Sequence, residues 1–268
     1  MQDKSRHTIG LVGRNALAAA VARQARAAGI EVVEGATARV ELVLVADPAA
    51  LEDAGADLPA GATVVDLTHG DPARAQAIAK SLAERGISFV DAPLHCEHLG
   101  RFPSEAAFLC GGDPQVLAGV APVLEKLGAR VVVCGEAGAG HVARAIVGAV
   151  AVCNRLITLE GAGMGFRNGL TVSDMGTVLE RCSGSNSGTT RVLPAIAEGR
   201  RTADMPLVDA AADLSLCVQL ARRVGAPVLI ATQAYSQVLG ASRIAGPDAT
   251  LDELRCLVEG GSGFSFTS

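Results

Sequence analysis

Two groups of side chains in the sequence combine residue types that move protons and hold anions. His141 and Arg144 are three residues apart, a spacing that places both on one face of a helix. His95 lies in a second group with His98. A histidine titrates near neutral pH and can act as acid or base, whereas an arginine stays protonated and suits a carboxylate, a phenolate or an enolate. These residue types predict proton transfer beside a stabilised anion.

The second group reads His95-Cys96-Glu97-His98. Its histidines and cysteine could ligate zinc, but their spacing matches none of the usual zinc patterns and no second cluster accompanies it. Cys96 beside His95 matches no nucleophile signature. The seven cysteines form no C-x-x-C pair, which is typical of reduced thiols in the cytoplasm. We therefore predict no metal site and a cytoplasmic protein.

A phosphate-binding turn is expected after the apolar run Ile9–Val12. The fingerprint is G-x-G-x-x-G, in which the middle glycine lets backbone N–H groups approach a pyrophosphate. The sequence here is Gly13-Arg14-Asn15-Ala16-Leu17-Ala18, so only Gly13 remains. Gly13 and Asn15 are therefore candidates for a weak, vestigial cofactor site. Glu34 falls where a ribose-binding acid stands in such motifs, although a solvated turn acid is the alternative.

Short β-branched runs alternate with helical segments over the first half of the chain, which predicts a doubly wound, mostly parallel sheet. The predicted strands are Ile9–Val12, Ile30–Glu34, Val40–Ala46, Thr63–Leu67, Ile87–Asp91, Ala106–Cys110 and Arg130–Cys134. The predicted helices are Ala16–Ala28, Pro72–Arg85 and Pro114–Leu127.

The second half contains only helical signals. One long apolar helix is predicted from Gly140 to about Gly165, and shorter helices follow at Thr171–Cys182, Thr189–Glu198, Leu207–Val224, Pro227–Leu239 and Thr250–Glu259. The last begins with a capping box, Thr250-Leu251-Asp252-Glu253. The pattern predicts a Rossmann-like domain at 1–137 and an all-α domain at 138–268.

The connection between Ile30–Val33 and Val40–Val45 is too short for a parallel crossover, which needs about a dozen residues. Either these strands are antiparallel neighbours, or the chain crosses the sheet edge in an extended form. Both alternatives predict a shortened sheet.

Charge and hydropathy exclude other classes of protein. The formal net charge is −5 and no basic stripe occurs, so nucleic-acid binding is not expected. The longest apolar stretch, Ala145–Cys153, is far shorter than the roughly 20 residues that span a bilayer, so no membrane association is expected.

Several motifs are similar to those of the β-hydroxyacid dehydrogenase family, which includes 3-hydroxyisobutyrate and 6-phosphogluconate dehydrogenases. They are Ile9-Gly10-Leu11-Val12-Gly13, Val90-Asp91-Ala92-Pro93, Cys110-Gly111-Gly112-Asp113, Pro122-Val123-Leu124 and Gly138-Ala139-Gly140-His141. The resemblance covers nearly the whole chain. It implies a Rossmann-like domain, a helical C-terminal domain on a long interdomain helix, a cleft between the domains, and dimers or tetramers, of which we expect a homodimer.

The sequence departs from the family at its functional positions. The family's catalytic lysine, which relays a proton, falls at Arg144, and an arginine cannot do this. The serine and glycines that hold the family's substrate carboxylate are replaced around His95 and Cys96. The resemblance also places Thr68 near the nicotinamide and Asn186 in a loop beside the cleft. An aspartate that the family shares, Asp213, is a candidate partner of the arginine.

The broken turn, the short connection and the lost lysine together predict loss of hydride chemistry. We expect a cofactor-independent lyase or isomerase on this scaffold, acting on a small anionic or phenolic substrate in the interdomain cleft. The predicted catalytic residues are His95, His141, Arg144 and Asp213, and the predicted substrate-binding residues are Thr68, Cys96 and Asn186. The alternatives are a divergent NAD(P)H-dependent oxidoreductase, of the hydroxyacid dehydrogenase or imine reductase type, and a non-catalytic binding protein.

Overall fold

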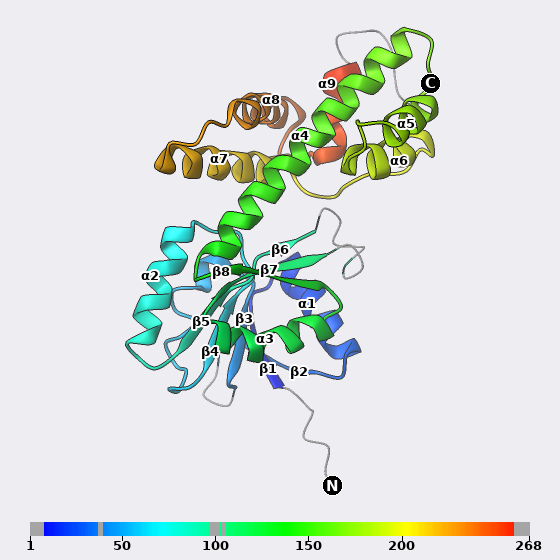
Figure 1. The fold of residues 1–268 in the computed structure, drawn as a ribbon. Coiled ribbons are helices and arrows are strands. Elements are labelled where there is room, and N and C mark those ends of the chain that lie inside the picture. Colours follow the sequence, from blue (N-terminus) through cyan, green and yellow to red (C-terminus); the bar gives the residue numbers. More distant parts are fainter. Residues whose placement is uncertain (1–7, 37–39, 97–101, 103–105, 260–268) are drawn as a thin grey trace. The chain divides into compact units, whose positions relative to one another are not determined.

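The computed structural model describes residues 8–36, 40–96, 102 and 106–259 (Figure 1). The chain divides into two compact units, Met1–Arg144 and Ala145–Ser268. The division falls inside a 29-residue helix, α4 (Ala139–Arg167). The predicted domain boundary, between residues 137 and 138, lies close to the start of the same helix.

The first unit is built on one mixed sheet. Its strands are β1 (Thr8–Val12), β2 (Glu31–Glu34), β3 (Leu42–Val45), β4 (Thr63–Asp66), β5 (Ser88–Asp91), β6 (Leu94–His95), β7 (Ala107–Gly112) and β8 (Arg130–Gly135). The order is β2-β1-β3-β4-β5-β7-β6, and β8 also pairs with β7. The first five strands in this order are parallel, and β7 runs antiparallel to β5 and β6. The predicted Rossmann-like, mostly parallel sheet is confirmed.

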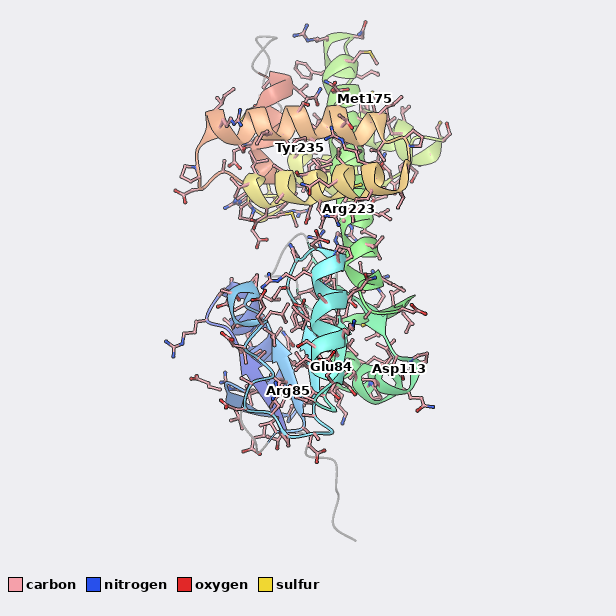
Figure 2. All side chains as sticks on the ribbon, turned by 90° about the vertical axis from the view of Figure 1, so that its left-hand side faces the viewer. Glu84, Arg85, Asp113, Met175, Arg223 and Tyr235 are labelled. Carbon is pink, nitrogen blue, oxygen red and sulfur yellow. The ribbon has the colours of Figure 1, made fainter. Side chains whose placement is uncertain are left out.

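Helices cover both faces of this sheet. Helices α1 (Ala16–Ala27) and α3 (Pro114–Lys126) pack on one face, and α2 (Pro72–Ala83) packs on the other (Figure 1). A short 3₁₀ turn, η1 (Pro48–Ala50), follows β3. Asp113, labelled in Figure 2, begins α3 by accepting hydrogen bonds from the N–H groups of Gln115 and Val116. Proline in the first turn of α2 and α3 suits a position where the missing N–H has no helical acceptor.

The short connection after β2 crosses β1. Strands β2 and β3 both pair with β1 in parallel, on its two sides, so the antiparallel alternative is wrong. The N–H of Gly35 donates to the Leu11 carbonyl at 2.9 Å, and Ala36 packs on the α2 face of the sheet. A Cβ on Gly10 would lie 2.7 Å from the Gly35 oxygen, so glycine is required where the chain crosses. Within its described residues this connection contains no helix.

The second unit is helical, as predicted. Its helices are α4 from Ala145 onward, α5 (Val172–Arg181), the π-turn η3 (Gly188–Val192), α6 (Leu193–Ala197), α7 (Leu207–Val224), α8 (Leu229–Ala245), the 3₁₀ turn η4 (Leu251–Glu253) and α9 (Leu254–Glu259). One stripe of α4 forms the centre of the core, from Ala145 through Val152 to Leu159. The predicted capping box is confirmed, because the Glu253 carboxylate accepts hydrogen bonds from the N–H and the hydroxyl of Thr250.

Helix α4 is longer than the sequence pattern predicted. It is long and apolar enough to cross a membrane by length and composition, with a mean hydropathy of 1.6 over its most apolar 18-residue window, and half of that window is buried inside the structure. The core helix of a globular protein meets the same criteria, so this is weak evidence for a membrane. The expectation of no membrane association stays a prediction.

Candidate functional site

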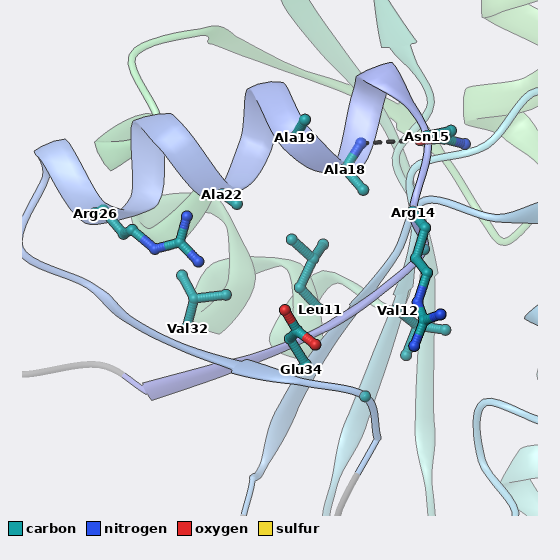
Figure 3. Close-up of a pocket in the computed structure, with 12 residues that line it drawn as sticks. Leu11, Val12, Arg14, Asn15, Ala18, Ala19, Ala22, Arg26, Val32 and Glu34 are labelled. Carbon is teal, nitrogen blue, oxygen red and sulfur yellow. Dashed lines mark hydrogen bonds between the residues drawn. The ribbon is translucent and has the colours of Figure 1, made fainter.

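A cavity of about 650 Å³ lies beside α1 (Figure 3). Its volume is in the range of small-molecule sites, roughly 300 to 1,000 Å³. It lies where β1 and β2 end and α1 begins, and this is the edge at which ligands bind in open α/β sheets. The lining residues are Leu11, Val12, Gly13, Arg14, Asn15, Ala18, Ala19, Ala22, Arg26, Val32, Glu34 and Gly35.

The turn at the mouth of the cavity depends on Gly13 but not on a second glycine. Gly13 has φ +136°, and a Cβ there would lie 3.2 Å from the Ala46 carbonyl carbon. Asn15 has an extended backbone, φ −95° and ψ −178°, which any residue adopts. Its side-chain oxygen accepts the N–H of Ala18 at 2.9 Å, and its amide donates to the Ala46 carbonyl at 2.7 Å. The Asn15 side chain is therefore held at the N-terminal end of α1 and points away from Leu11, which lines the cavity (Figure 3).

Three charged side chains line the cavity. Arg14 follows the glycine of the turn, Arg26 comes from the last turn of α1, and Glu34 ends β2 opposite Leu11 of β1. Among the described residues, none of these three side chains makes a hydrogen bond or ion pair. Two cations and one carboxylate leave a net positive cavity, which suits a ligand with phosphate groups.

A buried polar cluster lies where β4 and β5 end. Asp66 accepts the N–H of Thr68 at 2.8 Å and lies 3.0 Å from Nε2 of His141. Asp91 accepts the N–H groups of Gly138 at 2.7 Å and of His141 at 3.0 Å. Both carboxylates are fully buried. Asp91 thus caps the N-terminus of α4, while Asp66 fixes the orientation of the His141 ring.

Glycines allow α4 to begin directly against Asp91. A Cβ on Gly140 would overlap the Leu109 carbonyl oxygen and would lie 2.7 Å from Oδ2 of Asp91. A Cβ on Gly111 would lie 2.6 Å from Oδ1 of the same carboxylate. Residues of three of the motifs that resemble the family's, at Asp91, Gly111 and Gly138–His141, therefore meet in one buried joint between the sheet and α4. They hold the start of α4 on the sheet.

Burial alters two ionisable groups in this joint. Desolvation raises the pKa of the Asp91 carboxyl, against the hydrogen bond from Gly138 and the charge of His141, which lower it. Burial also raises the pKa of the Cys110 thiol to about 12, and nearby Cys134 and Asp91 add to this shift. A thiol with this pKa is uncharged at neutral pH and therefore unreactive.

Arg144 of α4 contacts the short strand β6, which contains His95. Arg144 is 2% exposed, and its Nε donates to the Leu94 carbonyl at 3.3 Å. Leu94 and half-buried His95 form β6, which pairs with Phe108 and Ala107 of β7. Two of the predicted catalytic residues, Arg144 and His95, are thus connected through strand β6. Their catalytic roles stay predictions.

The other candidates of the first unit are buried or undescribed. Thr68 is 3% exposed, and its backbone N–H donates a hydrogen bond to the Asp66 carboxylate. Cys96 packs in the apolar core that β1, α1 and α3 share. Glu97 and His98 lie outside the described residues. No group of three or more metal-ligating side chains occurs among the residues that were placed.

The two candidates of the second unit occupy ordered positions. Asn186 accepts the N–H of Gly188 at 2.7 Å and the hydroxyl of Thr158 at 3.2 Å, and so begins the π-turn η3. This accounts for Asn186 in structural terms, and its role toward substrate stays a prediction. Asp213 lies on α7 and is 5% exposed.

The sequence analysis assigned no role to the two buried aspartates. Both are the last residue of an apolar strand, Thr63-Val64-Val65-Asp66 and Ser88-Phe89-Val90-Asp91. A carboxylate at the end of a buried parallel strand lies at the ligand-binding edge of the sheet. An aspartate directly after an apolar strand pattern could therefore have identified both residues from the sequence.

Two protein-family models of dehydrogenases match this chain. The model of the NAD binding domain of 6-phosphogluconate dehydrogenase matches residues 4–135. The model of the NAD-binding region of NADP-dependent 3-hydroxyisobutyrate dehydrogenase matches residues 138–255. The two matches follow one another and together cover nearly the whole chain.

Individual relatives agree with these models. The NAD-dependent L-serine dehydrogenase of Pseudomonas aeruginosa is 30% identical over 180 residues, which is 66% of this chain and 59% of that protein. The chain therefore spans less than two thirds of the length of this relative. The Mycobacterium tuberculosis 3-hydroxyisobutyrate dehydrogenase structure with L-serine has a TM-score of 0.84 at 18% identity, covering 94% of this chain and 99% of that one. A reductive aminase from Aspergillus terreus with NADPH and ethyl levulinate has a TM-score of 0.56 at 18% identity, covering 93% and 98%.

The prediction of a cofactor-independent lyase or isomerase is wrong. Both matching models describe NAD-binding regions of dehydrogenases, and the 30%-identical relative is a dehydrogenase, so these matches favour the oxidoreductase alternative. The prediction rested in part on the broken turn, but the Asn15 side chain is held at the helix end by hydrogen bonds to Ala18 and Ala46. The chain belongs to the β-hydroxyacid dehydrogenase family.

Proposed function

We propose that this protein is an NAD-dependent oxidoreductase acting on a small hydroxy acid or the matching oxo acid. The observation that carries the proposal is the cavity at the start of α1, with Gly13 in its turn and Glu34 at the end of β2. Family membership supports the reaction class. The name of the Pseudomonas relative, an NAD-dependent L-serine dehydrogenase, supports the choice of cofactor and substrate class.

The residues present fit a nicotinamide dinucleotide. The turn at Gly13 and the N-terminus of α1 would hold the pyrophosphate, because first-turn N–H groups have no helical acceptor. Glu34 would bind the hydroxyls of the adenosine ribose. Its charge would repel the extra phosphate of NADP, which favours NAD. When bound, the dinucleotide supplies the hydride that is exchanged with substrate.

The departures from the family motifs change cofactor use without abolishing it. Asn15 satisfies one helix N–H itself, at Ala18, and so removes one contact that a phosphate would otherwise make. A weaker hold on the pyrophosphate is the expected result. Gly13 and the remaining first-turn N–H groups are left for the phosphate.

Arg144 binds charge rather than transferring a proton. Its guanidinium stays protonated, and its Nε is held on the Leu94 carbonyl. It binds the substrate carboxylate or the oxygen at which negative charge develops. His95, next along β6, is the acid or base for the hydroxyl proton. His141 is a positioning residue, because Asp66 and Asp91 hold its ring and its N–H.

A homodimer is part of this proposal. The dimer is supported by a second apolar stripe on α4, which is exposed and separate from the buried stripe of Ala145, Val152 and Leu159. Ile146, Val150, Ile157 and Met164 are between 50% and 67% exposed and follow heptad spacing. A helix that is apolar on both sides is normally covered on both, and a second copy of the chain would cover this stripe.

The reaction is tested by following NADH and NAD⁺ with purified protein and a panel of small acids. The panel contains L-serine, 3-hydroxyisobutyrate and their oxo products, together with neutral amides of the same acids. Turnover of an acid but not of its amide is expected. Arg144→Gln should raise KM at least tenfold while leaving NADH affinity unchanged. No hydride exchange with any acid, or equal turnover of acids and amides, would contradict the proposal.

A further inference from the structure

The outer strands β2 and β8 of the sheet carry different residues. β2 has a glutamate at each end, Glu31 and Glu34, and charged side chains on an outer strand oppose pairing with another chain. β8 instead contains the run Val131-Val132-Val133. Val132 is 45% exposed and Val133 is 63% exposed. An exposed, apolar outer strand is the type that pairs with a strand of another chain.

Strand β8 lies at an edge of the sheet in the described part of the chain. β5 and β6 pair with β7 in one continuous antiparallel register, so both lie on the same side of β7. β8 pairs with β7 in parallel and therefore occupies its other side. Among the described residues no further strand pairs with β8. Its outer side is thus a candidate for pairing between molecules.

The hydrogen bonds to β7 determine which main-chain groups of β8 point outward. The N–H of Arg130 donates to the Ala106 carbonyl at 3.1 Å, so Arg130 directs its main-chain groups toward β7. Successive residues of a strand direct these groups to opposite sides. Val131 and Val133 therefore direct their N–H and C=O groups away from β7, toward the outer edge.

A β-bulge ends this regular alternation. Val133 pairs with Cys110 of β7. The next residue of β7, Gly111, pairs with Gly135, so Cys134 is the extra residue of the bulge. The regular part of the outer edge therefore ends at Val133, and Val132 lies between its two outward-directed residues.

We infer that β8 pairs antiparallel with β8 of a second copy of this chain, about a twofold axis through Val132. Val131 then lies opposite Val133 of the second copy, and symmetry supplies the reverse pair. Both residues direct N–H and C=O outward, so each pair exchanges two main-chain hydrogen bonds. The exposed Val132 side chains meet at the axis, in a non-hydrogen-bonded pair, where side chains lie closest. The two sheets form one sheet that continues across both copies.

Charge supports a second copy as the occupant of this edge. Arg130 begins β8, Glu136 directly follows it, and both residues are exposed. Antiparallel pairing of identical strands brings the start of each strand to the end of the other. Arg130 of one copy therefore lies near Glu136 of the other at both ends of the pair. Parallel pairing would bring like charges together, which is unfavourable.

This interface is separate from the exposed stripe of α4 and does not depend on the proposed function. Two different twofold interfaces in one chain assemble a tetramer from dimers. A single short strand pair is smaller than the roughly 1,200 Å² that stable complexes bury, so the contact forms at high protein concentration. At the dilution of a chromatography column the α4 stripe alone determines the mass.

Disulfide trapping in concentrated protein tests the pairing. Val132→Cys is made together with Cys134→Ser, which removes the neighbouring thiol. The Cα atoms of a non-hydrogen-bonded pair lie about 4.5 Å apart, within the range of a disulfide, so mild oxidation should link position 132 of two copies. Val208→Cys with the same Cys134→Ser is the matched control, because Val208 is a 48% exposed valine of α7. Non-reducing gels measure the linked fraction, and peptide mapping identifies the bond. We expect at least about tenfold more linked product from position 132.

Further changes in the Val132→Cys protein separate strand pairing from chance collision. Val133→Pro removes an outward N–H without removing a hydrogen bond to β7, so it should abolish the link at an unchanged melting temperature. Arg130→Glu should reduce the link severalfold, and Arg130→Glu with Glu136→Arg should restore it.

Three results would overturn the pairing of β8. They are a link no stronger than that of Val208→Cys, a link that Val133→Pro leaves undiminished, and a double charge reversal that fails to restore what Arg130→Glu removes. The charge reversal decides by itself if Val133→Pro lowers the melting temperature. Each of these results leaves the oxidoreductase proposal and the α4 stripe untouched.

Discussion

Nε2 of His141 lies 3.0 Å from Oδ2 of Asp66, and both side chains are 1% exposed. The pair joins the end of β4 to the first turn of α4. Removing one member of a buried pair leaves the other without compensation, at a cost of about 3–5 kcal/mol. The joint at the start of α4 therefore depends on this contact.

We predict that His141→Ala lowers the free energy of unfolding of the first unit by about 3 kcal/mol or more. Chemical denaturation of wild type, His141→Ala, Asp66→Asn and the double variant measures this. The double variant should lose clearly less than the sum of the single losses, because the two residues share one interaction. Additive losses would show that the pair is not coupled.

Gly140→Ala should be among the most damaging single-methyl changes in this chain. The added Cβ would overlap the Leu109 carbonyl, and overpacking of this kind costs about 3 kcal/mol or more. Gly119→Ala is the control, because Gly119 lies inside α3 with nothing within 4 Å of its Cβ position. That change should stabilise by about 0.5–1 kcal/mol. Similar thermal stability of both variants would mean that α4 does not begin against β7.

The raised pKa of Asp91 predicts the sign of a pH effect on stability. Burial raises this pKa above 3.8, so the folded protein binds the proton more tightly than the unfolded chain. The resulting stabilisation is complete below pH 3.8 and is lost as the pH rises through the folded pKa. The unfolding free energy of wild type relative to Asp91→Asn should therefore increase as the pH falls through this window.

Asp174 is a control, because its pKa is shifted in the opposite direction and its effect on stability should therefore have the opposite pH dependence. The hydrogen bonds from the Thr171 hydroxyl and N–H lower its pKa below 3.8. Its stabilisation is present above that pH and is lost as the pH falls through the folded pKa. Wild type relative to Asp174→Asn should lose stability on acidification. The same sign for both aspartates would contradict the buried environment of Asp91.

The exposed stripe of α4 predicts a dimer that one charge disrupts. Ile157, 60% exposed, lies near the middle of the stripe, so Ile157→Glu should shift the protein to monomer in light-scattering chromatography. Val178→Glu, at a 50% exposed apolar residue of α5, should leave the dimer intact. A wild-type monomer at all concentrations would contradict the dimer. Sedimentation of such a monomer with phospholipid vesicles would assign the stripe to a membrane instead.

The sequence predicted most elements because their signals are local. Apolar residues at helical spacing set α1, and a capping aspartate with a first-turn proline sets both α2 and α3, to within a few residues. Strand β6 was missed, because two residues after Pro93 form a strand only by pairing with β7, which is distant in the sequence. The crossing over Gly10 was predicted only as one of two alternatives, since the choice depends on which strand lies between β2 and β3.

The candidate site was predicted less well, for a related reason. A motif match records residue types but not side-chain directions. Asn15 breaks the fingerprint in the sequence, yet its backbone needs no glycine and its side chain bonds at the helix end. The same limitation hid Asp66 and Asp91, whose partners come from residues about 50 or more positions later in the chain.

Equilibrium binding of NADH and NADPH, followed by nucleotide fluorescence, tests the central claim most directly. We predict saturable NADH binding with a Kd of about 1–100 µM, and NADPH binding at least about tenfold weaker because Glu34 repels the added phosphate. Glu34→Gln should reduce this difference by weakening NADH and strengthening NADPH. Absence of saturable binding of either dinucleotide, or a preference for NADPH that Glu34→Gln leaves unchanged, would contradict the account.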